Sequence, residues 1–247
     1  MEHKAIFRFY EELNDFLPSK NRKVPFDHEF NGKPSVKDAI ESLGVPHTEV
    51  DLILIDGVSV GFEQPLHPGD TVSVYPVFEA LDITQVARLR PTPLRTIAFV
   101  LDVHLGRLAA YLRILGFDSL YRNDYEDPEI IRISLEEGRI ILTRDLGILK
   151  NKRVTHGYWL RSQLPVEQLR EVMERLDLAA RTAPFTRCPV CNGLLERVAK
   201  SAIEGLLPPE TGRHYQDFSR CRGCGKLYWK GSHYEKLLRL VKTHTPQ

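Results

Sequence analysis

The chain has no apolar run that approaches the roughly 18 residues a helix needs to cross a membrane. Its first residues, MEHKAIFRFY, also lack the charged, apolar and small-residue regions of a secretory signal. We therefore expect a cytoplasmic location and no membrane partner. No G-x-G-x-x-G or Walker-type loop follows any predicted strand, so the sequence gives no support to a nucleotide cofactor.

Cysteine is scarce, with four in 247 residues, and all four fall into two C-x₂-C pairs. The pairs are Cys188 with Cys191 and Cys221 with Cys224, and 29 residues separate them. Two such pairs supply four thiolates for a closed tetrahedral Zn²⁺ site. Disulfides are the alternative, which a cytosolic location disfavours. The long gap between the pairs predicts a zinc ribbon with an inserted loop.

The net charge of +1 conceals an uneven distribution of charge along the chain. Residues 1–85 hold 7 Lys and Arg against 15 Asp and Glu, whereas the remaining residues hold 27 against 18. This split predicts separate domains, the second with affinity for phosphate backbones. Scattered, solvated charge is the alternative explanation.

The first 80 residues combine strand and helix signals. Alternating apolar residues, an Asp56-Gly57 turn pair and a helix preceded by Ser35 define the elements. The predicted elements are strands at 5–10 and 23–30, a helix at 36–43, and strands at 52–55, 58–60 and 71–77. Their order, ending in a PGDxVxVYP type strand, resembles the β-grasp fold of ubiquitin-like sulfur-carrier proteins.

Sulfur carriers end in Gly-Gly, whose free carboxylate is adenylated, but this chain continues through residues 77–81. Without a free terminus there is no carboxylate to activate. We therefore expect an interaction or packing module that offers a surface to a protein partner. Residues 83–95 contain Pro91 and Pro93 and are predicted to be a linker.

The middle of the chain alternates strand and helix signals, which predicts a parallel α/β sheet covered by helices. The predicted elements are strands at 97–101, 118–121, 139–143 and 154–160, and helices at 105–115, 127–137 and 166–178. In such sheets, sites form outside the carboxyl ends of the strands.

Three aspartates stand at ends of these elements: Asp102 and Asp145 after strands, and Asp127 at a helix start. Each has a structural alternative: Asp127 before Pro128 fits a helix N-cap, Asp102 could cap the helix that begins near Leu105, and Asp145 could cap the turn that follows it. Their joint placement nevertheless favours a shared site. Carboxylates brought together repel unless a cation neutralises them, and hard oxygen ligands suit Mg²⁺ or Mn²⁺.

The stretch FVLDVHLGRLAAYLRILGFDSLYRNDYED…EEGRIILTRD (99–145) resembles the PIN-like ribonuclease domain named after the C-terminus of the Mut-seven exonuclease. The resemblance covers about residues 97–180 and extends through the cysteine pairs to about residue 240. It implies that Asp102, Asp127 and Asp145 bind divalent metal for hydrolysis of RNA. Asp124 is a neighbouring candidate, because the run DYED leaves the middle position ambiguous.

Arginines and aromatic residues are candidates for contact with RNA. Arg107 and Arg144 could bind phosphate oxygens in bidentate fashion, or could be solvated surface residues. The ribbon mixes basic and aromatic side chains, which suits backbone attraction and base stacking unless the aromatics form its core. These residues are Arg187, Lys200, Arg213, Arg220, Arg222, Lys226 and Lys230, with Tyr215, Phe218, Tyr228 and Trp229.

The sequence thus predicts a β-grasp domain (1–82), a PIN-like α/β domain (96–182) and a zinc ribbon with a C-terminal helix (183–247). The predicted function is metal-dependent hydrolysis of single-stranded RNA, with the ribbon helping to hold it. A non-catalytic RNA-binding or ribosome-associated adaptor is the main alternative. A partner-binding protein with a PIN-like scaffold is another.

Overall fold

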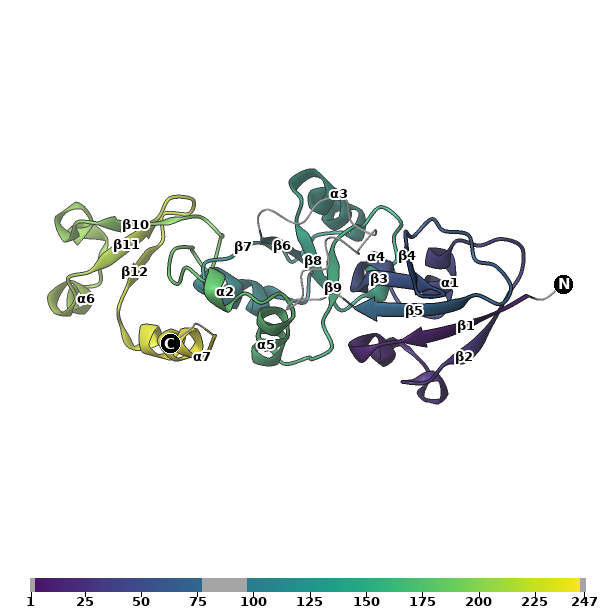
Figure 1. Cartoon of the computed structure of the whole chain (residues 1–247). Coiled ribbons are helices and arrows are strands. Elements are labelled where there is room, and N and C mark those ends of the chain that lie inside the picture. The colour runs from purple at the N-terminus through teal and green to yellow at the C-terminus, as the bar shows by residue number, and fades with distance from the viewer. Residues whose placement is uncertain (1–2, 77–96, 245–247) are drawn as a thin grey trace. The chain divides into compact units, whose positions relative to one another are not determined.

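The computed structural model describes residues 3–76 and 97–244 (Figure 1). The predicted linker at 83–95 and the segment 77–81 lie outside the described residues. The chain divides into two compact units. The first contains residues 3–76, 134–137 and 143–159, and the second contains 97–133, 138–142 and 160–244. None of the helices in the described ranges has the length and apolarity to span a bilayer.

Residues 3–76 form a five-stranded mixed sheet of order β2-β1-β5-β3-β4. Strands β1 and β5 pair in parallel, and the other neighbours are antiparallel. The strands are β1 (His3–Phe9), β2 (Phe26–Phe30), β3 (Val50–Ile55), β4 (Val58–Val60) and β5 (Thr71–Pro76). The helical elements are η1 (Glu11–Phe16), η2 (Ser19–Asn21), α1 (Val36–Ser42) and η3 (His47–Glu49).

Helix α1 and the sheet share one apolar core. Period-2 alternation places Phe7 and Phe9 of β1 beside Val72 and Val74 of β5, and Ile40 of α1 completes the cluster. The Asp56-Gly57 pair has positive φ at both residues, +50° and +82°, as the tight turn between β3 and β4 requires. The predicted β-grasp fold is confirmed.

The α/β sheet has the order β7-β6-β8-β9. Both β7 and β8 pair with β6 in parallel, and every residue of β6 and β8 is buried, as the continuous apolar runs predict. The strands are β6 (Ala98–Leu101), β7 (Asp118–Leu120), β8 (Ile140–Thr143) and β9 (Gly157–Trp159). The helical elements are α2 (Gly106–Ile114), α3 (Asp127–Glu137), α4 (Leu146–Leu149), α5 (Pro165–Arg175) and η4 (Ala179–Arg181).

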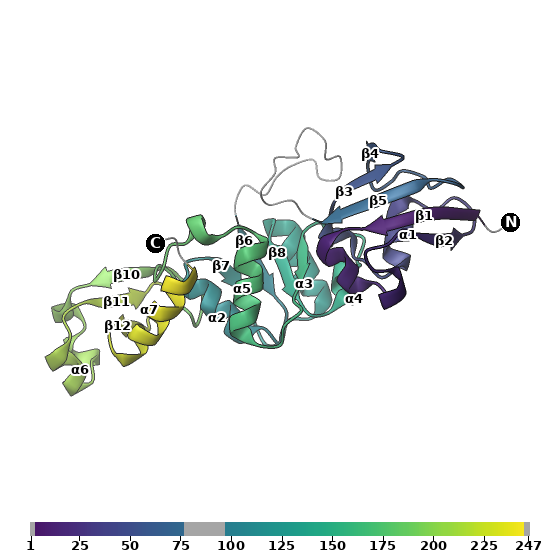
Figure 2. The ribbon, with the colours of Figure 1, turned by 60° about the horizontal axis from the view of Figure 1, so that its bottom comes forward.

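Helices α2 and α5 pack against each other (Figure 2). Helix α5 ends at Arg175, earlier than predicted, because Asp177 adopts a left-handed φ of +43° that turns the chain. Strand β9 is also shorter than the predicted 154–160. The predicted fold class is nevertheless confirmed.

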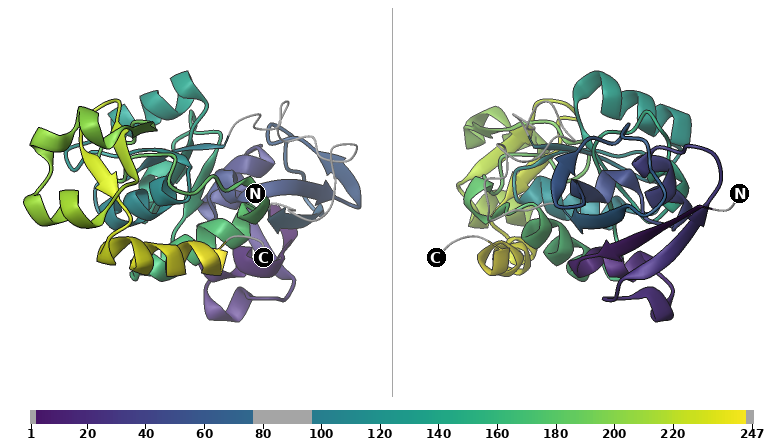
Figure 3. Two further views of the ribbon diagram at one scale, coloured as in Figure 1. Left: turned by 90° about the vertical axis from the view of Figure 1, so that its left-hand side faces the viewer. Right: turned by 45° about the vertical axis from the view of Figure 1, so that its right-hand side comes forward.

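The ribbon is a three-stranded antiparallel sheet of order β10-β11-β12, which can be followed in the left panel of Figure 3. Helix α6 lies in the predicted insertion between β10 and β11, and α7 follows β12. The elements are β10 (Leu195–Val198), η5 (Lys200–Ala202), η6 (Glu204–Leu206), α6 (Pro209–His214), β11 (Phe218–Cys221), β12 (Leu227–Trp229) and α7 (Ser232–His244).

The segment that leads into the ribbon lies directly on the end of α2. Ala183 N–H donates to Leu115 O at 2.8 Å, and Phe185 N–H donates to Ile114 O at 2.8 Å. Gly116 ends this helix with φ +97°, and a Cβ at that position would lie 2.2 Å from Ala183 O. This glycine is therefore required twice, for its backbone conformation and for the close approach of the segment.

Gly116→Ala should destabilise the second unit far more than Gly138→Ala. Gly138 also has a left-handed φ of +64°, but among the described residues, apart from its own chain neighbours, none lies within 4 Å of its Cβ position. The free energy of unfolding of the Gly138 variant should therefore fall only by the conformational penalty, about 1–2 kcal/mol. The free energy of unfolding of the Gly116 variant should fall by that amount and additionally by about 1–3 kcal/mol, because of the clash with Ala183. Urea unfolding of both variants measures the difference, and equal losses would show that the segment at Ala183 yields without cost.

Candidate functional site

Asp102 stands where β6 ends and the chain turns into α2. Its N–H donates to Leu142 O of β8 at 3.1 Å, which extends the parallel ladder by one bond. Its Oδ1 accepts from Val103 N–H at 2.6 Å, and the side chain is partly exposed. The turn is held from the other side by Tyr121, whose hydroxyl donates to Val103 O at 2.7 Å. The backbone around Asp102 is therefore fixed by the sheet and by Tyr121.

Tyr121 and Gly106 were missed by sequence reasoning. A Cβ on Gly106 would lie 2.9 Å from the Tyr121 ring, so the glycine makes room for the ring that anchors the Asp102 turn. The glycine of the LG pair in the motif was the signal available. Tyr121 carries none, because its role depends on a contact across 18 positions.

Asp145 caps α4, as one of its two interpretations predicted. Its Oδ1 accepts from Gly147 N–H at 2.7 Å, and its own N–H donates to the buried Thr143 hydroxyl at 2.8 Å. The T-x-D sequence is thus a local device that orients the aspartate after β8. A carboxylate offers about four acceptor positions, so capping leaves acceptor capacity on this exposed side chain.

The N-cap interpretation of Asp127 is wrong by one residue. Helix α3 begins at Asp127, and the first helical bond is accepted by the carbonyl of Glu126 from Ile130 N–H at 3.0 Å. Asp127 is therefore an exposed acid in the first turn, where a negative charge is favoured by the helix dipole.

Asp124 is held by Arg122 through a two-bond contact. The guanidinium donates to both carboxylate oxygens, from Nε at 2.9 Å and from Nη2 at 2.7 Å. This hydrogen bonding lowers the pKa of Asp124. Both oxygens of Asp124 are therefore engaged, so a cation bound there would have to share them with the Arg122 guanidinium.

The acids and arginines predicted for catalysis are distributed over both units. Asp102 and Asp127 belong to the second unit and Asp145 to the first. Among the described residues, the four cysteines are the group of three or more potential metal ligands whose donor atoms lie together. Arg107, in the first turn of α2, and Arg144, before Asp145, are both exposed.

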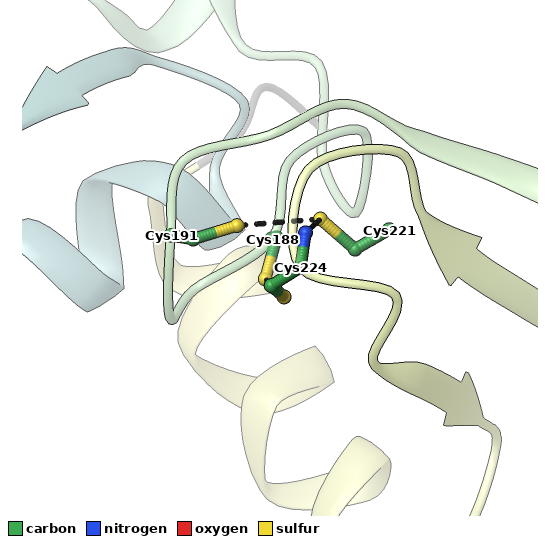
Figure 4. A group of neighbouring side chains, drawn as sticks. All are labelled: Cys188, Cys191, Cys221 and Cys224. Carbon is green, nitrogen blue, oxygen red and sulfur yellow. Dashed lines mark hydrogen bonds between the residues drawn. The ribbon is translucent and has the colours of Figure 1, made fainter.

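The four cysteines converge as predicted. All four Sγ atoms lie within 4.8 Å of one another, and they come from two loops (Figure 4). The Cys188–Cys224 sulfur distance is 3.8 Å and the Cys191–Cys221 distance is 3.3 Å. Tetrahedral coordination with Zn–S bonds of about 2.3 Å requires sulfur separations of about 3.8 Å. The four thiols therefore fit one Zn²⁺ ion.

Backbone N–H groups also turn toward these sulfurs. Cys221 Sγ accepts from the N–H groups of Gly223 at 3.3 Å and of Cys224 at 3.5 Å. A Cβ on Gly193 would lie 2.9 Å from the same sulfur. The glycines of both loops thus allow the backbone to approach the cluster closely, as a metal-binding knuckle requires.

Electrostatics within the cluster favour a bound cation. Burial alone would raise the pKa of the Cys188 thiol, but hydrogen bonds led by that from Tyr228, at 2.9 Å, outweigh it and lower that pKa to about 7. Burial, reinforced by the neighbouring sulfurs, raises the pKa of Cys191 to about 12. Thiolates brought this close together repel one another unless a cation neutralises them. Sequence reasoning missed the role of Tyr228.

The first cysteine loop is joined to the α/β domain by a buried polar network. Arg113 of α2, 4% exposed, donates to Pro189 O at 3.1 Å and to Val190 O at 3.0 Å from Nη1. Its Nε donates to Ser119 O at 2.8 Å. Ser119 N–H in turn donates to Asn192 Oδ1 at 3.1 Å.

Asp118 is the centre of this network. It accepts from Asn192 Nδ2 at 2.8 Å and forms ion pairs with Arg139 at 2.7 Å and with Arg187 at 3.1 Å. Burial would raise the pKa of Asp118, but the hydrogen bonds from Arg139 and Asn192 outweigh it and lower that pKa. Arg187, predicted as an RNA-binding candidate, is thus engaged in joining the ribbon to β7.

Other basic and aromatic residues of the ribbon also make contacts within the ribbon. Ion pairs join Arg213 to Glu210, Arg222 to Glu196, and Lys230 to Asp217. Phe218 is 3% exposed and belongs to the core, whereas Tyr215 and Trp229 are half-buried. Arg220 and Lys226 are exposed and have no ion pair within the described part of the chain.

Comparison with known families gives two matches. The model described as the Mut7-C RNAse domain matches residues 97–241, which is more than half of the chain. The model described as Mut7-C ubiquitin matches residues 2–82. No significant match was found among curated proteins or among solved structures. The first match covers both the α/β sheet and the cysteine cluster, and the chain therefore belongs to the Mut7-C RNase domain family.

Proposed function

We propose that this protein is a divalent-metal-dependent ribonuclease that hydrolyses single-stranded RNA. The observation that supports this most is the match to a ribonuclease family over residues whose acids follow two neighbouring parallel strands. Leu101 of β6 lies opposite Leu142 of β8, and Asp102 and Asp145 come shortly after these residues. Carboxyl ends of adjacent parallel strands are where α/β proteins place their sites.

The donor set suits Mg²⁺ or Mn²⁺, which prefer carboxylate oxygens. Asp102, Asp127 and Asp145 would hold the cation, and Asp124, whose oxygens Arg122 engages, is the neighbouring candidate. A bound divalent cation polarises the scissile phosphate and lowers the pKa of a water molecule. Arg107 and Arg144 would orient RNA by donating to phosphate oxygens.

The ribbon would contribute RNA binding and a structural Zn²⁺. Cys188, Cys191, Cys221 and Cys224 would hold the zinc, and their sulfur separations fit this ion. Arg220 and Lys226 would attract the RNA backbone, since no ion pair neutralises them within the described residues.

A non-catalytic RNA-binding adaptor is the second candidate. It is favoured by the capping role of Asp145, which accounts for this residue without metal. The Asp145→Asn variant separates the two functions. An adaptor with this substitution would keep its RNA affinity, and neither it nor the wild-type protein would form product with any metal.

Asp102→Asn and Asp145→Asn should each lower RNA cleavage in Mg²⁺ or Mn²⁺ by on the order of 100-fold or more. Asparagine caps a helix as well as aspartate does, so Asp145→Asn preserves the bond from Gly147 N–H while removing the charge. Cleavage of labelled single-stranded RNA, with and without chelator, measures the effect. Glu167→Gln, at a partly exposed acid of α5, is the control and should retain activity. Undiminished cleavage in both aspartate variants would rule out the proposed site.

Purified wild-type protein should contain about one Zn²⁺ per chain. Cys221→Ser should lose it, since a fourth thiolate is missing, whereas Tyr228→Phe should keep the stoichiometry with about 10-fold weaker affinity. Mass spectrometry of metal content and competition with a chromogenic chelator measure both. Zinc-free protein with two disulfides would contradict this assignment.

Arg220→Gln combined with Lys226→Gln should weaken RNA binding and reduce its dependence on salt. For single strands, each phosphate that a cation neutralises contributes about 0.7 to the slope of log K against log salt, so the slope should fall by about 1.4 in the double variant. Fluorescence anisotropy in the Asp145→Asn background measures binding without cleavage. Arg213→Gln is the control, because Glu210 already pairs with this arginine at 2.9 Å. An unchanged slope in the double variant would place the RNA elsewhere.

A further inference from the structure

The segment that carries Asp145 belongs to the same compact unit as the ubiquitin-like domain. Residues 143–159 join residues 3–76 in the first unit. The contacts come from η3 and η1 of the ubiquitin-like domain and reach β9 and the loop before it. They combine one buried and one partly buried hydrogen bond with aromatic packing.

Two of these contacts involve buried polar side chains. His47, 5% exposed, is 2.6 Å from Val154 O through Nε2, and it must donate there because a carbonyl oxygen only accepts. Glu49, 1% exposed, accepts from Trp159 N–H at 2.7 Å through Oε1. A buried carboxylate is costly unless hydrogen bonds compensate it. The bond to Glu49 holds the backbone of Trp159 in β9.

The Trp159 ring is held from the same side. The Phe16 ring of η1 lies 5.0 Å from it, centroid to centroid, at an interplanar angle of 43°. With its backbone bound to Glu49 and its ring against Phe16, Trp159 has both parts positioned by the ubiquitin-like domain.

The indole of Trp159 then reaches the peptide next to Asp145. Its Nε1–H donates to Arg144 O at 3.2 Å. The following residue, Asp145, accepts the capping bond from Gly147 N–H and donates its own N–H to the Thr143 hydroxyl. Trp159 thus fixes the carbonyl side of the same peptide whose N–H belongs to Asp145.

We propose that Trp159 is a positioning residue for Asp145, and that the ubiquitin-like domain acts as an intramolecular brace through Glu49 and Phe16. This inference rests on the proposed function, in which Asp145 binds the divalent cation. A displacement of a catalytic group by about 1 Å can cost on the order of 100-fold in rate. The brace gives the ubiquitin-like domain a role in catalysis without any chemistry of its own.

Trp159→Phe in the full-length protein is the central test. Phenylalanine keeps a ring against Phe16 but removes the N–H that donates to Arg144 O. The Mg²⁺ concentration for half-maximal cleavage should rise about 5-fold, as expected for one hydrogen bond, while the KM for RNA stays unchanged. Amide hydrogen exchange at Asp145 and Gly147 should also rise about 5-fold.

Two further variants separate bracing from general destabilisation. Glu49→Ala removes the acceptor for Trp159 N–H and should shift the Mg²⁺ requirement in the same direction, whereas Glu49→Gln keeps an oxygen acceptor and should restore most of the loss. Lys152→Gln is the matched control on the same segment, because its contact with Asp38 is exposed and spans 4.0 Å. It should change neither the Mg²⁺ requirement nor the exchange.

The inference would be overturned by a Trp159→Phe protein with a normal Mg²⁺ requirement and normal exchange at Asp145 and Gly147. If the wild-type protein cleaves RNA in that case, the proposed ribonuclease function still stands. A shift in thermal unfolding alone would also overturn the inference, since that marks a merely structural contact. Absence of metal-dependent cleavage by wild-type protein would instead overturn the proposed function, and the catalytic role of the brace with it.

Discussion

The pairing of β6 with β8 is the constraint on which the rest of the α/β domain depends. Every side chain of both strands is buried, so their backbone groups must be satisfied within the sheet. Where the strands end, the ladder stops and N–H groups need other acceptors. Asp102 and Asp145 supply them, through Val103 N–H and Gly147 N–H. For Asp145, which caps α4, the capping and metal-binding interpretations are compatible, because a carboxylate held by a cap is already oriented. Asp102 does not cap α2, whose N-cap is Leu105.

The polar network around Asp118 joins the sheet to the first cysteine loop, and both lie within the residues that one family model matches. Asp118 of β7 forms ion pairs with Arg139 and Arg187. Arg139 directly precedes β8, and Arg187 directly precedes Cys188 of the first cysteine loop. Arg113 binds two carbonyls of that loop. Removing one partner from this partly buried network leaves the other charges less well compensated. The ribbon is thus joined to the α/β domain through buried contacts with β7 and α2.

Local signals in the sequence predicted the elements that depend on local physics. Continuous apolar runs identified β6 and β8, the Asp56-Gly57 pair identified a hairpin, and the C-x₂-C spacing identified the cysteine cluster. Tertiary partners gave no such signal. Arg187 resembled a surface cation until its partner 69 positions earlier was known, and Glu49 meets Trp159 across 110 positions. No periodicity connects residues so far apart, because their contact is a property of the folded chain alone.

The contacts of η3 with the segment after Asp145 also limit which surface of the ubiquitin-like domain a partner can bind. His47 and Glu49 are buried and hydrogen-bonded to the segment that follows Asp145, so a partner could reach them only by displacing Val154 and Trp159. Exposing these groups would remove hydrogen bonds worth about 1.5–3 kcal/mol each where a charge is involved. A partner that bound this face would therefore release Trp159 and, through Arg144 O, loosen the backbone of Asp145. A partner that bound elsewhere on the domain would leave the brace intact. The same contacts that position the acid thus determine which face of the domain a partner can use without affecting the proposed site.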